Sequence, residues 1–269
     1  MSNLTDLISS GGGGSASFPT IFLSKSQTWV PFQDGNICIH VIGGGGGGGG
    51  SSSNASSGAA GGYCKKNSLA VTTAGSFTVV VGVGGDGKAN GGGANGGNST
   101  VAGTGLASTL TANGGQGGGA SASPIPAGGT AANGDVNNTG GAGWYNGGGG
   151  AVGLTGTGQQ GGYDNGSKFA GECDVIGDFW SSTMGQLAGG KAGQAANQNG
   201  DSSSASVVSQ AGPLSGGSFN LKGGTIYGQV NGGNGGIGAG GGKGENANSA
   251  TMASGGDGGE GIVVIQYIP

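Results

Sequence analysis

The sequence predicts an all-β fold, in which a small antiparallel β-sandwich formed by N- and C-terminal strands carries a glycine-rich body of polyglycine-II rods. Glycine accounts for 76 of the 269 residues, several times its average share of about 7 %. Strand-like apolar stretches lie near both ends of the chain. Between them glycine recurs at every third position in several places, which matches the three residues per turn of a polyproline-II helix.

We expect three parts along the chain. Residues 1–17 contain a short polyglycine run at 11–14 and are expected to form an N-terminal attachment arm or linker, with a frayed terminus as the alternative. Residues 18–83 and 261–269 form the sandwich, and residues 84–260 form the polyglycine-II bundle with exposed loops. The strands of the sandwich are predicted at 18–23, 27–32, 36–42, 68–73, 76–83 and 261–268.

The third of these stretches, residues 36–42, is apolar at both alternating sets of positions, which is typical of a strand buried between two layers. It is preceded by an Asp34-Gly35 turn signal and runs directly into eight glycines, residues 43–50. The aromatic residues of the strand regions are expected in the core: Trp29, Phe32, Phe77 and Tyr267.

The glycine-rich body shows the three-residue period at Gly232, Gly235, Gly238, Gly241 and Gly244. Such spacing leaves one face of a rod bare, so antiparallel rods can approach closely and hydrogen-bond laterally. The alternative is a flexible linker, because glycine loses more backbone entropy on ordering than any other residue. Apolar residues between the glycine runs favour order, as packing contacts on the rods: Val101, Leu106, Leu110, Leu154, Leu187, Val207, Val208, Leu214, Leu221 and Ile226.

Charge and composition argue against several classes. Twelve acidic residues against eight lysines give a net charge of −4, so no nucleic-acid partner is expected. No apolar run approaches the roughly 20 residues of a membrane span, and the N-terminus lacks the pattern of a secretory signal. Three cysteines without paired spacing, Cys38, Cys64 and Cys173, are expected to be buried free thiols. With a single histidine in the chain, we expect no metal site and no cofactor.

Residues 82–87 match the phosphate-binding pattern GxGxxG, and Lys88 extends the match toward a P-loop. Ala89 stands where a P-loop has serine or threonine, and no helix follows to hold a phosphate. In a chain this rich in glycine the pattern also arises by chance. We therefore expect no phosphate site.

No active site is expected either. His40 lies inside an apolar strand and no oriented partner can be singled out, so a packed or hydrogen-bonded strand histidine is the prediction. A small acidic cluster is too sparse for calcium and is expected to be solvated: Asp164, Glu172, Asp174 and Asp178.

Aromatic residues interrupt the glycine-rich body, where thin rods leave little core to bury them. Exposed rings in polar loops are typical of sugar- or protein-binding surfaces. The candidate receptor-binding residues are Trp144, Tyr145, Tyr163, Phe169, Phe179 and Trp180. The alternative is that these rings cap and seal the bundle.

Three places in the sequence carry a family resemblance. They are Trp29-Val30-Pro31 followed by the alternating stretch 37–45, then residues 77–85, and finally residues 255–265. They resemble, in this order, the opening strand that runs into polyglycine, the later strand and the closing element of the glycine-rich tail-fibre proteins of bacteriophages. The chain is also similar in style to adhesins at the ends of long tail fibres, in which polyglycine-II layers carry variable receptor loops.

The resemblance implies a virion protein of a tailed phage, in the tail fibre or tail tip, assembled in the host cytoplasm. Its N-terminal region would attach to other tail or fibre proteins, and its loops would bind a bacterial surface glycan or an outer-membrane protein. Fibres are commonly trimeric, so a homotrimer is the implied assembly. The alternatives are a purely structural fibre or decoration protein of the virion, an ice-binding or matrix protein and, least favoured, an enzyme.

Overall fold

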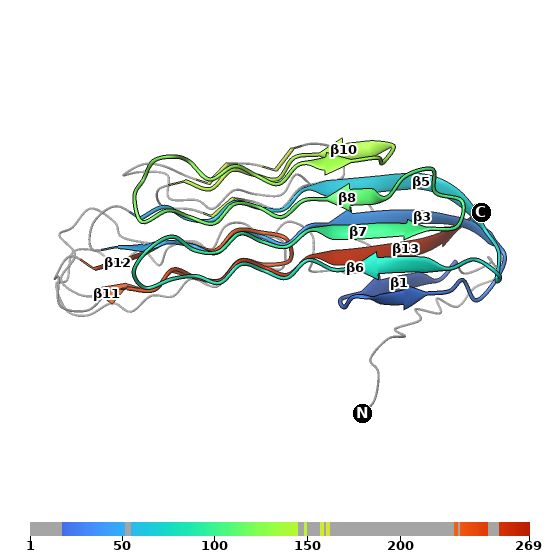
Figure 1. The fold of residues 1–269 in the computed structure, drawn as a ribbon, viewed down its shortest axis with the longest axis horizontal. Helices are drawn as coiled ribbons and strands as arrows, with labels where there is room; N and C mark the ends of the chain where they lie inside the picture. Colours follow the sequence, from blue (N-terminus) through green and yellow to red (C-terminus); the bar gives the residue numbers. More distant parts are fainter. Residues whose placement is uncertain are drawn as a thin grey trace, which may run out of the picture.

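The computed structural model describes residues 18–51, 55–144, 148–149, 157–158, 160–161, 229–230, 232–246 and 253–269. This described part is all-β and contains no helix; nothing in it could therefore cross a membrane as a helix. It is elongated, with the large sheets at one end and extended rods running to the other (Figure 1). We call the sheet end, where Phe18 and the carboxyl terminus lie, proximal, and the opposite end distal.

Two five-stranded antiparallel sheets form the sandwich. The first sheet has the order β1 (Thr20–Leu23), β13 (Ile262–Ile268), β3 (Gly35–Ile42), β5 (Tyr63–Val71) and β10 (Val136–Asn138). The second has the order β2 (Gln27–Trp29), β6 (Phe77–Val80), β7 (Ser99–Gly103), β8 (Leu110–Ala112) and β9 (Ala131–Ala132). Thr20 of β1 lies opposite Gln266 of β13, so strands from the two ends of the chain pair, as predicted.

A third, small sheet lies at the distal end. It consists of β11 (Gln229–Val230), β12 (Gly244–Asn246) and β4 (Gly50–Ser51), with β12 parallel to β4 (Figure 1). The short turns near Gly35 and Gly75 do not form hairpins; each carries the chain from one large sheet to the other. The two crossings are joined, because the Thr73 amide donates a hydrogen bond to the Asp34 carboxylate at 2.7 Å.

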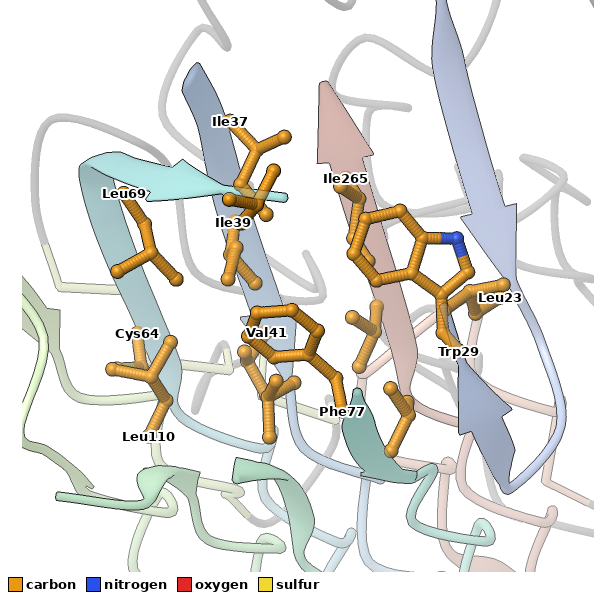
Figure 2. Close-up of a cluster of buried hydrophobic side chains, with 14 of the residues drawn as sticks. Leu23, Trp29, Ile37, Ile39, Val41, Cys64, Leu69, Phe77, Leu110 and Ile265 are labelled. Carbon is orange, nitrogen blue, oxygen red and sulfur yellow. The ribbon is translucent and has the colours of Figure 1, made fainter. Parts of the chain in front are cut away.

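The core between the large sheets is apolar. Figure 2 shows Ile37, Ile39 and Val41 of β3 beside Phe77, whose ring centroid lies 5.4 Å from that of Trp29. Trp29, Phe77 and Tyr267 are buried, as predicted. The prediction for Phe32 is wrong: β2 ends at Trp29, and Phe32, in the following loop, is 55 % exposed, with its ring tilted against that of Tyr267.

Strands and rods alternate along the chain, so they do not separate at residues 83 and 261 as we expected. β7 to β10 lie within 84–260, and the glycines of 43–50 form a rod. Val101 and Leu110, predicted to pack on rods, are fully buried in the sandwich core. The physical reason is that a segment can leave a sheet as a strand and continue distally as a rod without reversing direction.

Residues 43–50 form a central rod that is hydrogen-bonded to six others. Its amides donate in rotation to three antiparallel rods, 55–62, 91–97 and 253–261. The carbonyls of residues 44–49 accept from three parallel rods, 82–88, 113–119 and 239–244. Three residues per turn direct successive amides to three different sides, which gives this arrangement. The prediction that the rods are antiparallel is therefore wrong for three of the six neighbours, which run distally in the same direction as β3.

Every position of the central rod requires glycine, not one position in three. A Cβ atom on Gly45 would collide with the carbonyl oxygen of Ala239, and one on Gly46 with that of Gln116. The outer rod 82–88 has a free side, where Val83 is 67 % exposed and Asp86 is also exposed. The fraction of positions in a rod that must be glycine thus increases with the number of rods packed around it.

The predicted glycine period at 232–244 spans two rods, not one. A turn at Ile237-Gly238 separates them, and Gly238 has a φ of 65° that favours glycine. The two rods then pair, with the Gly242 amide donating to the Gly233 carbonyl at 2.8 Å.

Candidate functional site

A turn between rods at Ile237-Gly238 lies next to the sandwich, beside Ile42 of β3. Two other connections between rods, both fully described, lie toward the distal end (Figure 1). Residues 89–91 join rod 82–88 to rod 91–97, and residues 120–125 join rod 113–119 to the chain returning through 126–130.

The bases of both connections are held by the rods behind them. Gly50 and Gly91 exchange two hydrogen bonds of 3.0 Å, which fixes the first connection to the central rod. At the second, the Gly119 amide donates to the Ser56 hydroxyl at 2.8 Å. Both connections therefore leave a rigid base, which reduces the entropy lost when such loops bind a partner.

The side chains on these connections are mostly small and uncharged. Asn90, Ser121 and Ser123 are exposed, and Ile125 adds a large apolar side chain that is 40 % exposed. Sequence reasoning missed this region because it searched for aromatic rings. The serines and Pro124 between two glycine-rich stretches were the available signal, since this composition is typical of turns.

Trp144 is the one predicted receptor-binding residue that falls within the described part of the chain. Its carbonyl accepts a 2.8 Å hydrogen bond from the Ser57 amide, near the level where Ser56 contacts Gly49 and Gly119. The residue is half-buried, and its indole nitrogen is enclosed. Trp144 therefore packs against the distal part of the bundle with one portion and reaches solvent with another.

The other five candidates, Tyr145, Tyr163, Phe169, Phe179 and Trp180, lie outside the described residues. Their role in receptor binding stays a prediction. The acidic cluster Asp164, Glu172, Asp174 and Asp178 and the third cysteine, Cys173, lie outside as well.

His40 is a hydrogen-bonded strand histidine, as predicted. Its Nδ1 lies 2.8 Å from the Tyr63 hydroxyl, and its Nε2 lies 3.3 Å from the Cys38 sulfur. Burial, assisted by the positive charge of Lys65, lowers the pKa of His40 to about 3. Burial also raises the pKa of Cys38 and of Tyr63. The three groups are thus uncharged at neutral pH, and the His40–Tyr63 bond links β3 to β5.

The GxGxxG segment is part of an outer rod. The Gly85 and Lys88 amides donate to the Gly45 and Gly48 carbonyls, and the Gly87 amide donates to the Asp257 carboxylate at 2.8 Å. A phosphate-binding loop needs such amides directed at the ligand. Here they hold rods together, which explains why the pattern does not form a phosphate cradle.

Cys38 and Cys64 are buried free thiols, as predicted. Within the described part of the chain, no three side chains of histidine, cysteine, aspartate or glutamate gather as a metal-binding group.

These features define a class of protein: an all-β sandwich that continues into a hydrogen-bonded polyglycine-II bundle. A family model described as a glycine-rich domain matches residues 21–268. The chain therefore belongs to this glycine-rich domain family. A search of curated proteins gave no significant match.

Proposed function

We propose that this protein is a virion component of a tailed bacteriophage, in the tail fibre or tail tip, that recognises the host cell surface through loops held by the glycine-rich scaffold. The observation that carries the proposal is the polarity of the molecule. Phe18, which follows the N-terminal arm, lies at the proximal end, whereas the connections 89–91 and 120–125 lie toward the distal end (Figure 1).

The distal side chains suit a bacterial surface glycan or an exposed loop of an outer-membrane protein. Hydroxyl and amide groups, such as those of Ser121 and Asn90, can hydrogen-bond a receptor, while Ile125 and Trp144 offer apolar surface. The N-terminal region attaches to other tail or fibre proteins of the particle. Assembly as a homotrimer would present three copies of the site, and weak binding would then gain by avidity.

A purely structural fibre or decoration protein is the second candidate. The half-burial of Trp144 favours it, because a ring that packs on the bundle stabilises the rods whether or not a receptor binds.

Immunogold labelling of intact particles with an antibody against the chain tests the location. Label at the distal ends of tail fibres or at the tail tip supports the proposal. Label on the head, or no label on any particle, contradicts it.

Adsorption of particles that carry variant chains tests receptor binding. We expect Ile125→Arg and Trp144→Ala to slow adsorption to host cells at least tenfold. Val83→Arg is the matched control, because Val83 is exposed on the flank of rod 82–88, away from the distal connections. Normal adsorption by all three variants, with normal amounts of each chain in the particle, would favour the structural candidate.

A further inference from the structure

Asparagine precedes glycine at five places where the structure describes both residues. These are Asn90-Gly91, Asn95-Gly96, Asn113-Gly114, Asn133-Gly134 and Asn234-Gly235. Asn-Gly is intrinsically prone to spontaneous deamidation, because glycine has no side chain to hinder the approach of its amide to the asparagine side chain.

In this reaction the glycine amide gives up its proton, and its nitrogen forms a bond to Cγ of the asparagine. The bond from Cγ to the side-chain nitrogen breaks, and that nitrogen leaves as ammonia, which takes up the proton. Water then opens the succinimide ring to aspartate or isoaspartate. The product carries an added negative charge and, as isoaspartate, an extra methylene in the main chain.

A glycine amide that donates a hydrogen bond elsewhere is hindered in this reaction, because it keeps its proton and points away from the asparagine before it. Three of the five amides donate to carbonyls of neighbouring rods. Gly91 donates to Gly50 at 3.0 Å, Gly96 to Gly115 at 2.9 Å, and Gly235 to Asp257 at 2.8 Å. These three sites are protected by the backbone lattice itself.

The other two amides donate to a side chain. The Gly114 amide donates to Oδ1 of Asn98 at 2.9 Å, and the Gly134 amide donates to Oδ1 of Asn137 at 3.0 Å. The reactive side chains are held as well: Nδ2 of Asn113 donates to the Thr130 hydroxyl, and Nδ2 of Asn133 donates to the Thr109 carbonyl.

We propose that Asn113 and Asn133 are latent sites of spontaneous deamidation. Each is protected in the folded protein by a neighbouring asparagine side chain, Asn98 and Asn137 respectively, together with the hydrogen bond that holds its own Nδ2. Isoaspartate at position 113 would lengthen the rod backbone by one methylene. The three-residue repeat, on which every later hydrogen bond of that rod depends, would then be out of phase.

The test measures deamidation at residue 113 by peptide mapping, after the full chain is incubated at pH 9 and 37 °C. Asn98→Ala removes the acceptor and should accelerate deamidation roughly five- to tenfold, as the loss of one hydrogen bond implies. Asn98→Asp retains an oxygen acceptor and should stay near the wild-type rate. Urea-unfolded wild-type protein supplies the rate for an unprotected site.

Asn95→Ala is the matched control. Oδ1 of Asn95 accepts from the Gly117 amide at 2.8 Å, so this variant loses the same kind of bond between the same two stretches of chain. Gly117 follows Gln116, not an asparagine. We therefore expect no acceleration at residue 113 in this variant.

Equal acceleration at residue 113 in Asn95→Ala and Asn98→Ala would overturn the proposal, because general loosening would then explain the effect. So would a folded wild-type rate equal to the unfolded rate. If Asn98→Ala does not fold, Asn137→Ala tests the second site, with accelerated deamidation at residue 133 as the supporting result and an unchanged rate as the overturning one.

Discussion

The Gly45 amide donates a 2.8 Å hydrogen bond to the carbonyl of Gly259, which joins the central rod to the rod that leads into β13. On another side of Gly45 lies the Ala239 carbonyl, where a Cβ atom would collide. The same residue thus makes a bond that holds the bundle together and leaves no room for a side chain.

Gly45→Ala should lower the free energy of unfolding by about 1–3 kcal/mol, because the new methyl group can be accommodated only if two rods move apart. Gly92→Ala is the control, since its added Cβ would lie 3.1 Å from the Gly118 oxygen and needs only a small shift. Urea unfolding followed by circular dichroism measures both. Equal stability of the two variants would contradict the close packing around the central rod.

Asp257→Ala should lower the free energy of unfolding by about 1 kcal/mol. The reason is that the Asp257 carboxylate accepts a hydrogen bond from the Gly87 amide, which links two outer rods. Asp86→Ala removes an exposed carboxylate from rod 82–88 and should be nearly neutral. Thermal unfolding of the two variants at pH 7 makes the comparison, and a larger loss for Asp86→Ala would refute it.

His40 should make stability depend on pH between 6.5, its ordinary pKa, and about 3, its pKa in the folded protein. In this range the unfolded chain binds a proton that the folded chain does not, so stability is highest above pH 6.5 and falls as the pH decreases. The slope approaches about 1.4 kcal/mol per pH unit. Urea titrations of wild type and His40→Gln at pH 4 and pH 7 measure this contribution. If both proteins lose the same stability between pH 7 and pH 4, His40 makes no such contribution and the prediction is contradicted.

The Asp135 carboxylate should contribute weakly and in the same direction. The pKa of Asp135 is lowered mainly by the 2.8 Å hydrogen bond from Lys66 and, to a smaller extent, by the hydrogen bond from the Asn67 amide. The contribution of Asp135 to the free energy of unfolding is full above the ordinary pKa of aspartate. It is lost as the pH falls through the lowered pKa. The pair is half-exposed, so Asp135→Asn should reduce stability at pH 7 by less than about 1 kcal/mol. Melting curves of wild type and Asp135→Asn at pH 7 and pH 2.5 check this prediction. A larger loss of stability at pH 2.5 than at pH 7 would contradict it.

The sequence predicted the fold class, the pairing of the chain ends and the burial of Trp29, Phe77 and Tyr267. These follow from apolar alternation, which is a local pattern. It did not predict that residues 99–103 and 110–112 complete the second sheet. Those strands are short, and their glycine-rich surroundings obscure the apolar alternation. Strand formation there becomes favourable only once β6 offers an edge for pairing.

The candidate site was less predictable. Aromatic content drew attention to Trp144, but the sequence does not state how much of that ring the bundle covers. The hydrogen bond of Asn98 to the Gly114 amide was also not predictable. In this bond the Asn98 side chain takes the place of a rod carbonyl. Such a contact between two rods leaves no periodic signal in the sequence.

The interior of the rod bundle is made of peptide groups, whereas the interior of the sandwich is made of apolar side chains. Unfolding exposes apolar surface with a positive change in heat capacity and polar surface with a negative one. The rods therefore offset part of the heat-capacity change contributed by the sandwich. The stability of the described part should therefore vary less with temperature than that of a side-chain-packed domain of equal length, and it should lose little stability on cooling.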